Sequence, residues 1–178
     1  MERGWQIVRS RYIPRAEMAH LLAGCMPQNA EALRLSLDYG VRIGDVLRMP
    51  IEAAKTGRWS FKEEKTGKRR IVKLSEAHRQ ALLSFGGKIY AFEHRLDPHK
   101  HRTRQAVYKD LTRIAKAFRL VQVTPHSARK IYAVQALARF GGDMERVQHL
   151  LNHSSAAVTM LYCYADQLGQ RRRKETKR

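Results

Sequence analysis

The sequence predicts a mainly helical α+β domain that carries one small antiparallel β-sheet. Apolar residues recur at the i, i+3, i+4 spacing of helices along most of the chain, whereas strand-like runs occur only between residues 59 and 74. Gly and Pro punctuate the segments between these patterns. With 178 residues, 43% of them apolar, the chain is long enough for one domain with a buried core.

Three helices are expected before the strands. The first begins near Pro14, because proline suits the first turn of a helix, and buries Met18 and Leu22. The second spans residues 29–39 and ends at Gly40. Ile43, Val46 and Leu47 then share one face of a short helix that we expect to stop at Pro50.

The β-sheet is predicted as a single hairpin. Residues 59–61 and 70–74 are the strand-like runs, and residues 64–68 form the turn between them. Ser75 is a good N-cap for a following helix, which runs to Phe85.

Four further helices are expected after a loop at residues 90–101. Their ranges are 103–118, 127–140, a segment capped by Asp143, and 156–166. The domain organisation is then an N-terminal linker or arm at residues 1–13, one domain at 14–166 and a basic C-terminal tail at 167–178. The tail is polar and strongly basic, so we expect it to be ordered only by a partner.

The charge balance points to a polyanionic partner. Thirty-five Lys and Arg residues oppose 16 Asp and Glu, for a net charge of +19 and an isoelectric point of about 10.6. A field of this strength favours nucleic acid over an anionic membrane surface. No apolar run approaches the roughly 20 residues that span a bilayer. Two cysteines make no disulfide framework, so a reducing, cytosolic compartment is the simplest expectation.

Several residues have the chemistry to cleave a phosphodiester without a metal. Arg42 and Arg129 are candidates to neutralise the phosphate, because the planar guanidinium binds phosphate oxygens in a bidentate manner. His126 lies one helical turn before Arg129, so both side chains should reach the same place. In so basic a chain, Arg42 taken singly is better explained as a surface arginine.

Lys65 occupies the predicted hairpin turn, where a lysine can reach a groove and donate a proton to a leaving oxygen. Lys62 and Lys68 are its rivals, and ordinary hairpin solubility is the alternative reading for all three. Asp45 is either a support for an arginine or histidine of the site or an exposed helix acid.

Tyr162 is the candidate nucleophile, since tyrosine oxygen is a known type of covalent nucleophile, and His153 precedes it by nine residues. Tyr164 lies two residues later and should face another way on a helix. A core position for Tyr162 is the alternative. His149 and His153 could instead bind zinc, but no third ligand has suitable spacing.

Taken in order, these residues resemble the catalytic domain of the tyrosine recombinase, or phage-type integrase, family. The matching strings are Tyr39-Gly-Val-Arg-Ile-Gly-Asp45, Lys65-Thr-Gly-Lys68, Thr124-Pro-His-Ser-Ala-Arg129 and Leu150-Leu-Asn-His-Ser-Ser155, followed by Tyr162. The resemblance covers residues 14–166 and implies the integrase catalytic-domain fold. Each string has little specificity, and the specificity comes from their order and spacing.

The resemblance implies a role for each matching residue. Arg42 and Arg129 are expected to bind the scissile phosphate, and Lys65 to protonate the leaving 5′ oxygen. His126 is expected to assist the nucleophile and the phosphate. The remaining assignments are a supporting acid at Asp45, a ligand of a nonbridging oxygen at His153 and the nucleophile at Tyr162.

The implied reaction is strand cleavage and rejoining through a 3′-phosphotyrosyl link, with no cofactor, metal or ATP. The implied partners are duplex DNA, three further copies of the chain in a tetramer on two duplexes, and accessory DNA-bending proteins, all in a cytoplasmic, nucleoid-associated setting. The alternatives are a type IB topoisomerase-like or end-resolving enzyme with the same site, and a basic DNA-binding module whose catalytic set is idle.

The chain departs from the family pattern in two strings. Asn152 stands where a glycine is usual, and Ala128-Arg129-Lys130 replaces a more typical Leu-Arg-His. Most relatives also carry an N-terminal core-binding domain, whereas only about 13 residues precede the first expected helix. The sequence is therefore expected to be a catalytic fragment or a short single-domain relative.

Overall fold

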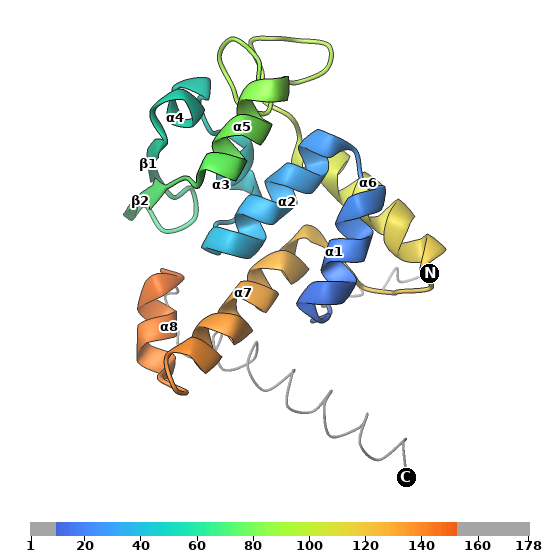
Figure 1. Cartoon of the computed structure of the whole chain (residues 1–178), viewed down its shortest axis with the longest axis vertical. Helices are drawn as coiled ribbons and strands as arrows, with labels where there is room; N and C mark the ends of the chain where they lie inside the picture. The colour runs from blue at the N-terminus through green and yellow to red at the C-terminus, as the bar shows by residue number, and fades with distance from the viewer. Residues whose placement is uncertain (1–9, 153–178) are drawn as a thin grey trace, which may run out of the picture.

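The computed structural model describes residues 10–152, in which eight helices and two strands form a mainly helical domain (Figure 1). In chain order the elements are α1 (Arg15–Gly24), α2 (Pro27–Tyr39), α3 (Ile43–Leu47), α4 (Ile51–Thr56), β1 (Arg58–Lys62), β2 (Arg69–Lys73), α5 (Glu76–Phe85), α6 (Arg104–Ala117), α7 (Pro125–Arg139) and α8 (Met144–Leu150). The predicted fold class is confirmed. The helix expected at 156–166 lies outside the described residues.

Helix α2 is the centre of the fold. It contacts α1, α3, α5, α6 and α7, and eight of its thirteen residues are buried. It ends at Gly40, whose φ of 63° is left-handed. A Cβ atom at Gly40 would lie 2.3 Å from the ring of Tyr132 on α7, so both the backbone and the packing require glycine there.

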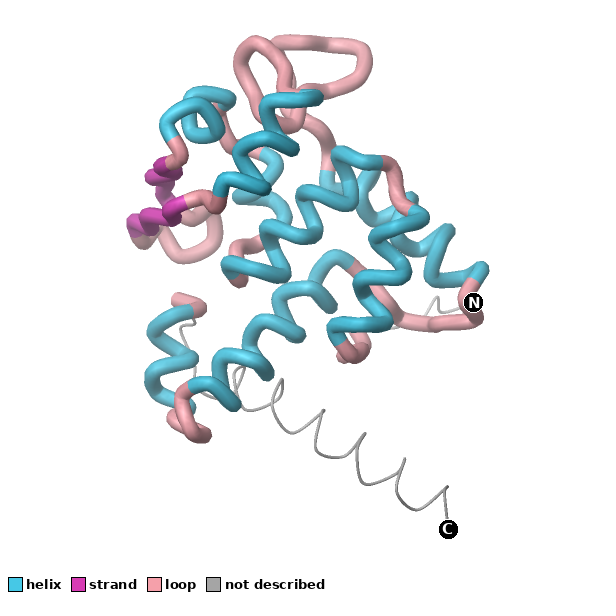
Figure 2. Tube along the Cα trace, viewed as in Figure 1, coloured by secondary structure: helices cyan, strands magenta, loops and turns pink. Residues whose placement is uncertain are grey.

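The β1–β2 hairpin lies at one edge of the domain, beside α4 and α5 (Figure 2). The strands pair antiparallel, with Trp59 opposite Val72 and Phe61 opposite Arg70. Alternate residues face inward, and the rings of Trp59 and Phe61 stack with their centroids 4.0 Å apart. The prediction of one hairpin is confirmed.

Helix α4 was not predicted. The short helix α3 ends before Pro50, as expected, but Pro50 is also the N-cap of α4, and Gly57 ends that helix with a φ of 71°. Proline disfavours the continuation of a helix that precedes it, and it is well accommodated at a helix start. The other described helices confirm the predicted segments with small changes of bounds.

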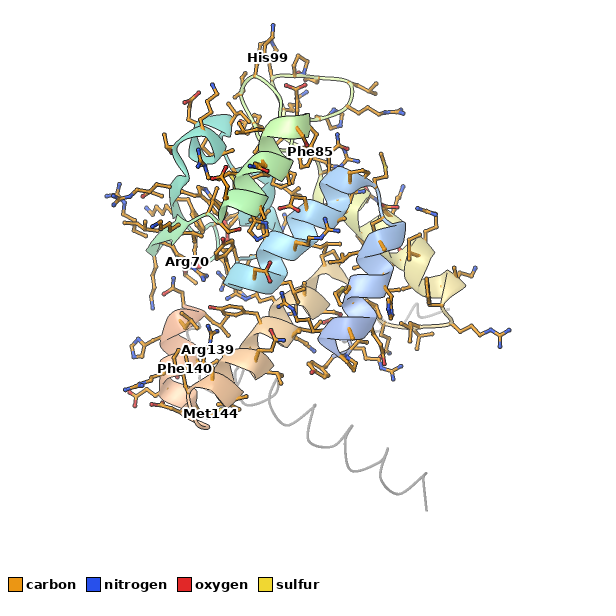
Figure 3. All side chains as sticks on the ribbon, in the orientation of Figure 1. Arg70, Phe85, His99, Arg139, Phe140 and Met144 are labelled. Carbon is orange, nitrogen blue, oxygen red and sulfur yellow. The ribbon has the colours of Figure 1, made fainter. Side chains whose placement is uncertain are left out.

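The C-terminal helices form a second small core. Tyr132, Ala133 and Ala136 of α7 pack against Val147 and Leu151. In Figure 3, Arg70 on β2 lies where the hairpin faces these helices, whereas His99 lies at the opposite end of the molecule, in the loop after α5.

No helix within residues 10–152 has the length and apolar character needed to cross a bilayer.

Candidate functional site

A pocket of about 400 Å³ gathers five of the predicted site residues. Those five are Arg42, Asp45, Lys65, His126 and Arg129. The remaining lining residues are Ser36, Ile43, Gly44, Glu64, Arg104 and Pro125. Segments up to 93 residues apart in the chain therefore border one cavity that is rich in cations.

Arg42 is the N-cap of α3, in the turn that follows Gly40. Its backbone carbonyl accepts hydrogen bonds from the N–H groups of Asp45 and Val46, which fixes the start of the helix. Its Nη1 donates to Oε2 of Glu63 over 2.7 Å, and one fifth of the side chain remains exposed. The guanidinium is thus held on one side by a carboxylate while it borders the pocket.

Asp45 is buried, so the reading as an exposed helix acid is wrong. Its Oδ1 accepts a 3.0 Å hydrogen bond from the backbone N–H of Glu64 and one of 2.6 Å from Arg48. Within the described part of the chain, these contacts are to the hairpin turn and to Arg48, not to a predicted arginine or histidine of the site. Asp45 therefore supports the turn that carries Lys65.

Lys65 lies at the tip of the β1–β2 hairpin and lines the pocket, whereas Lys62 and Lys68 do not line it. The turn is closed by backbone hydrogen bonds from Gly67 N–H to the Glu63 carbonyl and from Glu63 N–H to the Lys68 carbonyl. Of the three lysines that the sequence left as rivals, Lys65 has the geometry that a site residue requires.

His126 and Arg129 reach the pocket from the first turn of α7. This turn is fixed by Pro125 at its start and by a capping box in which Thr124 and Ser127 bond reciprocally. Burial and the positive charges of Arg129, Lys130, Arg42 and Lys65 lower the pKa of His126 to about 4. The imidazole is therefore neutral at pH 7, and its burial and cationic neighbours disfavour its protonation in the absence of a bound anion.

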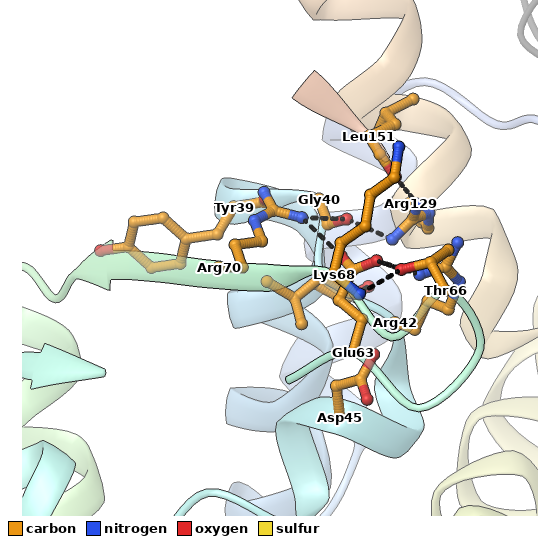
Figure 4. Close-up of polar contacts among 12 residues, drawn as sticks. Tyr39, Gly40, Arg42, Asp45, Glu63, Thr66, Lys68, Arg70, Arg129 and Leu151 are labelled. Atoms are coloured by element: carbon orange, nitrogen blue, oxygen red, sulfur yellow. Dashed lines mark hydrogen bonds and ion pairs between the residues drawn. The ribbon is translucent and has the colours of Figure 1, made fainter. Parts of the chain in front are cut away.

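Arg129 is only 1% exposed and ties three parts of the chain together. Its Nη1 donates to the Gly40 carbonyl over 2.7 Å and its Nη2 donates to the Leu151 carbonyl over 2.5 Å (Figure 4). The first bond places Arg129 beside the turn that carries Arg42. The second anchors the end of α8 to α7.

Two residues of this region were not singled out from the sequence. Glu63 lies at the end of β1 with its side chain fully buried, and it contacts Arg42, Thr66 and Arg70. The alternation of the strand could have identified Glu63 from the sequence, because it places this residue on the inward face with Trp59 and Phe61.

Arg104, the first residue of α6, adds a further cation to the pocket lining. The sequence placed it only within the helix expected at residues 103–118. Its position at the pocket depends on how α6 packs against α3, which no local pattern reveals.

The described residues do not include His153, Tyr162 or Tyr164. Of the alternative zinc pair, His149 is described and His153 is not. Among residues 10–152 there is no group of three or more His, Cys, Asp and Glu side chains that could hold a metal ion.

The sequence matches a model of the phage integrase family over residues 11–168. It is 30% identical over 135 residues to the tyrosine recombinase XerD of Rhizobium meliloti (strain 1021), covering 70% of this chain and 43% of that protein. It is 29% identical over 153 residues to the integrase of Escherichia phage P2, covering 86% of this chain and 42% of that one. The chain thus spans less than half the length of these relatives.

The fold is also similar to that of a solved lambda integrase(75-356) dimer bound to a COC′ core site. The TM-score is 0.68 at 20% sequence identity, and the match covers 87% of this chain and 59% of the other.

Proposed function

This chain belongs to the phage integrase family, and from that premise we propose that it is the catalytic domain of a site-specific DNA recombinase. It would cleave and rejoin DNA strands through a 3′-phosphotyrosyl intermediate, without metal or ATP. One observation supports this above the others: Arg42, Lys65, His126 and Arg129 border a single pocket although they come from three separate segments.

The proposed cleavage step uses these groups around one phosphate. Tyr162 attacks the phosphorus, so a phosphorus–oxygen bond to tyrosine forms and the bond to the 5′ oxygen breaks. Arg42 and Arg129 neutralise the charge that grows on the nonbridging oxygens, and His153 binds one of those oxygens. The bound phosphate adds negative charge beside His126 and so favours its protonated form, which lets the imidazole take the tyrosine proton, while Lys65 gives a proton to the leaving 5′ oxygen. Rejoining is the reverse reaction with a 5′-hydroxyl of a partner strand.

Duplex DNA is the proposed substrate. The net charge of +19 suits a polyanion, and the solved lambda integrase of similar fold is bound to a DNA core site. We further propose a tetramer on two duplexes, accessory DNA-bending proteins, and action at the nucleoid. In this scheme residues 14–166 are the catalytic domain, flanked by an arm at 1–13 and a basic tail at 167–178.

Covalent trapping tests the proposed function. A duplex that carries a candidate attachment sequence and a nick near the cleavage point loses its short 5′ fragment after attack, so the adduct accumulates. Wild-type protein should give a protein–DNA band in a denaturing gel, and Tyr162→Phe should give none. An adduct that survives in Tyr162→Phe but disappears in Tyr164→Phe would move the nucleophile to Tyr164.

The alternatives give different outcomes in the same assay. An idle DNA-binding module would bind the duplex and form no adduct. A topoisomerase-like enzyme would form adducts on unrelated sequences and relax supercoiled plasmid without exchanging strands.

A further inference from the structure

Glu63 is a buried acid in a strongly basic surrounding. Its side chain is fully buried at the end of β1, in a chain in which Lys and Arg outnumber Asp and Glu by 35 to 16. Burial by itself would raise the pKa of Glu63, but hydrogen bonds from Thr66 and Arg42 lower it below the ordinary value. The carboxylate is therefore charged, and a buried charge is retained only where several partners compensate it.

The first partners of Glu63 carry or flank predicted catalytic groups. Oε2 accepts 2.7 Å hydrogen bonds both from Nη1 of Arg42 and from the hydroxyl of Thr66, the residue after Lys65. The backbone of Glu63 also closes the hairpin turn through Gly67 and Lys68. One residue thus fixes the guanidinium of Arg42 and the turn that carries Lys65.

The remaining partners extend this network to the C-terminal end of the described chain. Oε1 of Glu63 lies 3.5 Å from Arg70, which also donates to the carbonyls of Tyr39 and Gly40. The side chain of Asn152 also helps to lower the pKa of this carboxylate. Asn152 is followed directly by His153, so the network ends where the predicted C-terminal catalytic segment begins.

Asn152 has the backbone conformation of a glycine and a side chain that glycine lacks. Its φ of 52° lies in the left-handed region, which asparagine tolerates better than most residues. This explains how Asn152 replaces the glycine that is usual at this place in the family. The contribution to the Glu63 carboxylate comes from the side chain, which a glycine at this position would lack.

We propose that Glu63 is a positioning residue that holds Arg42, the Lys65 turn and the chain at Asn152 in one mutual arrangement for cleavage. The inference rests on the proposed function, because it concerns the same site. If the carboxylate only balanced charge, the effect of replacing one partner would not depend on whether another had been replaced. A positioning carboxylate instead couples the hairpin turn to the segment that leads to His153.

Glu63→Gln tests the positioning role, and Glu52→Gln is its control. Both changes raise the net charge by one, but Glu52 is exposed and pairs only with Lys55 of its own helix among the described residues. Glu63→Gln should slow adduct formation at saturating DNA at least about tenfold, since small misplacements of catalytic groups are costly. Its affinity for DNA should be unchanged or slightly higher, as for Glu52→Gln.

Hydrogen exchange of the DNA-free protein reports the coupling without any need for activity. Glu63→Gln should speed exchange both in the turn at residues 64–68 and at residues 149–152. Asn152→Gly keeps the left-handed backbone available and removes the amide, so it should also speed exchange in both segments. In adduct formation the two changes should be non-additive, with Asn152→Gly adding little in the Glu63→Gln background.

The outcomes separate this inference from the proposed function. If wild type forms the adduct and Glu63→Gln reacts as fast as Glu52→Gln, the positioning role is overturned and the function stands. Faster exchange confined to the turn, or additive effects of the two changes, would also overturn it. If wild type forms no adduct while exchange rises in both segments, the coupling stands and the proposed function falls. Should Glu63→Gln fail to fold, Asn152→Gly carries the same test.

Discussion

The guanidinium of Arg129 donates a 2.7 Å hydrogen bond to the carbonyl oxygen of Gly40, 89 residues earlier in the chain. This bond joins the first turn of α7 to the loop that presents Arg42. With the second bond to the Leu151 carbonyl, it makes Arg129 a structural residue as well as a candidate phosphate ligand. The two roles are separable by experiment.

Arg129→Lys should lower the free energy of unfolding by about 2–3 kcal/mol. The ammonium of lysine cannot span both carbonyls as the guanidinium fork does, and a lost hydrogen bond of a buried charged group costs roughly that much. Urea denaturation followed by circular dichroism measures the change. Arg42→Lys is the comparison, since Arg42 is more exposed and bonds a carboxylate that lysine also reaches. Equal midpoints for Arg129→Lys and wild type would contradict the structural role.

Lys65→Ala should bind DNA nearly as well as wild type but cleave it slowly, because it removes the proposed proton donor and leaves the arginines in place. A substrate with a 5′-thiol leaving group needs no such proton and should restore most of the lost rate. Single-turnover adduct formation on the two substrates measures this. Lys68→Ala is the matched control from the same turn, and a defect of similar size there would transfer the role to Lys68.

Arg104→Ala should weaken DNA binding on every sequence and flatten its dependence on salt. A lost phosphate contact reduces the slope of log K against log salt by about 0.9. Binding titrations at several salt concentrations measure the slope. Lys109→Ala removes a charge from the same helix away from the pocket and should leave the cleavage rate of bound DNA unchanged. A slope equal to wild type in Arg104→Ala would exclude a phosphate contact.

His78 should make the stability of the domain depend on pH above neutrality. Burial alone would lower the pKa of His78, but hydrogen bonds to Asp38 and Glu31 raise it from 6.5 to about 9. The raised value means that the stabilisation is complete below pH 6.5 and is lost as the pH rises through about 9. The loss should be on the order of 3 kcal/mol.

The difference in unfolding free energy between wild type and His78→Gln isolates this effect, because other groups titrate equally in both proteins. That difference should shrink between pH 6.5 and 9.5. A difference that stays constant over this range would show that His78 does not hold a proton in the folded protein.

Much of the fold follows from local patterns, and its exceptions have physical reasons. The helical spacing predicted most helices, and Ser75 marked a true helix start. Helix α4 was missed because Pro50 was taken as a stop, although proline also suits a start. The isolated bridge from Pro50 to Tyr90 joins residues 40 positions apart, and local periodicity does not encode such a contact.

The candidate site was predicted where side-chain chemistry and motif order were informative. Arg42, Lys65, His126 and Arg129 border one pocket, as their pattern suggested. The supporting contacts were not predicted, because a buried carboxylate such as Glu63 has no motif and gains its meaning only from its neighbours. The roles of His153 and Tyr162 stay predictions.

A genetic survey of this domain should find that Gly40 does not tolerate substitution. It has no side chain to bind or react, yet any replacement would strike the Tyr132 ring and displace the carbonyl that receives Arg129. Random mutagenesis scored by recombination should therefore rank it beside the reactive residues. Counts of essential positions in such a screen will overstate the number of groups that touch DNA.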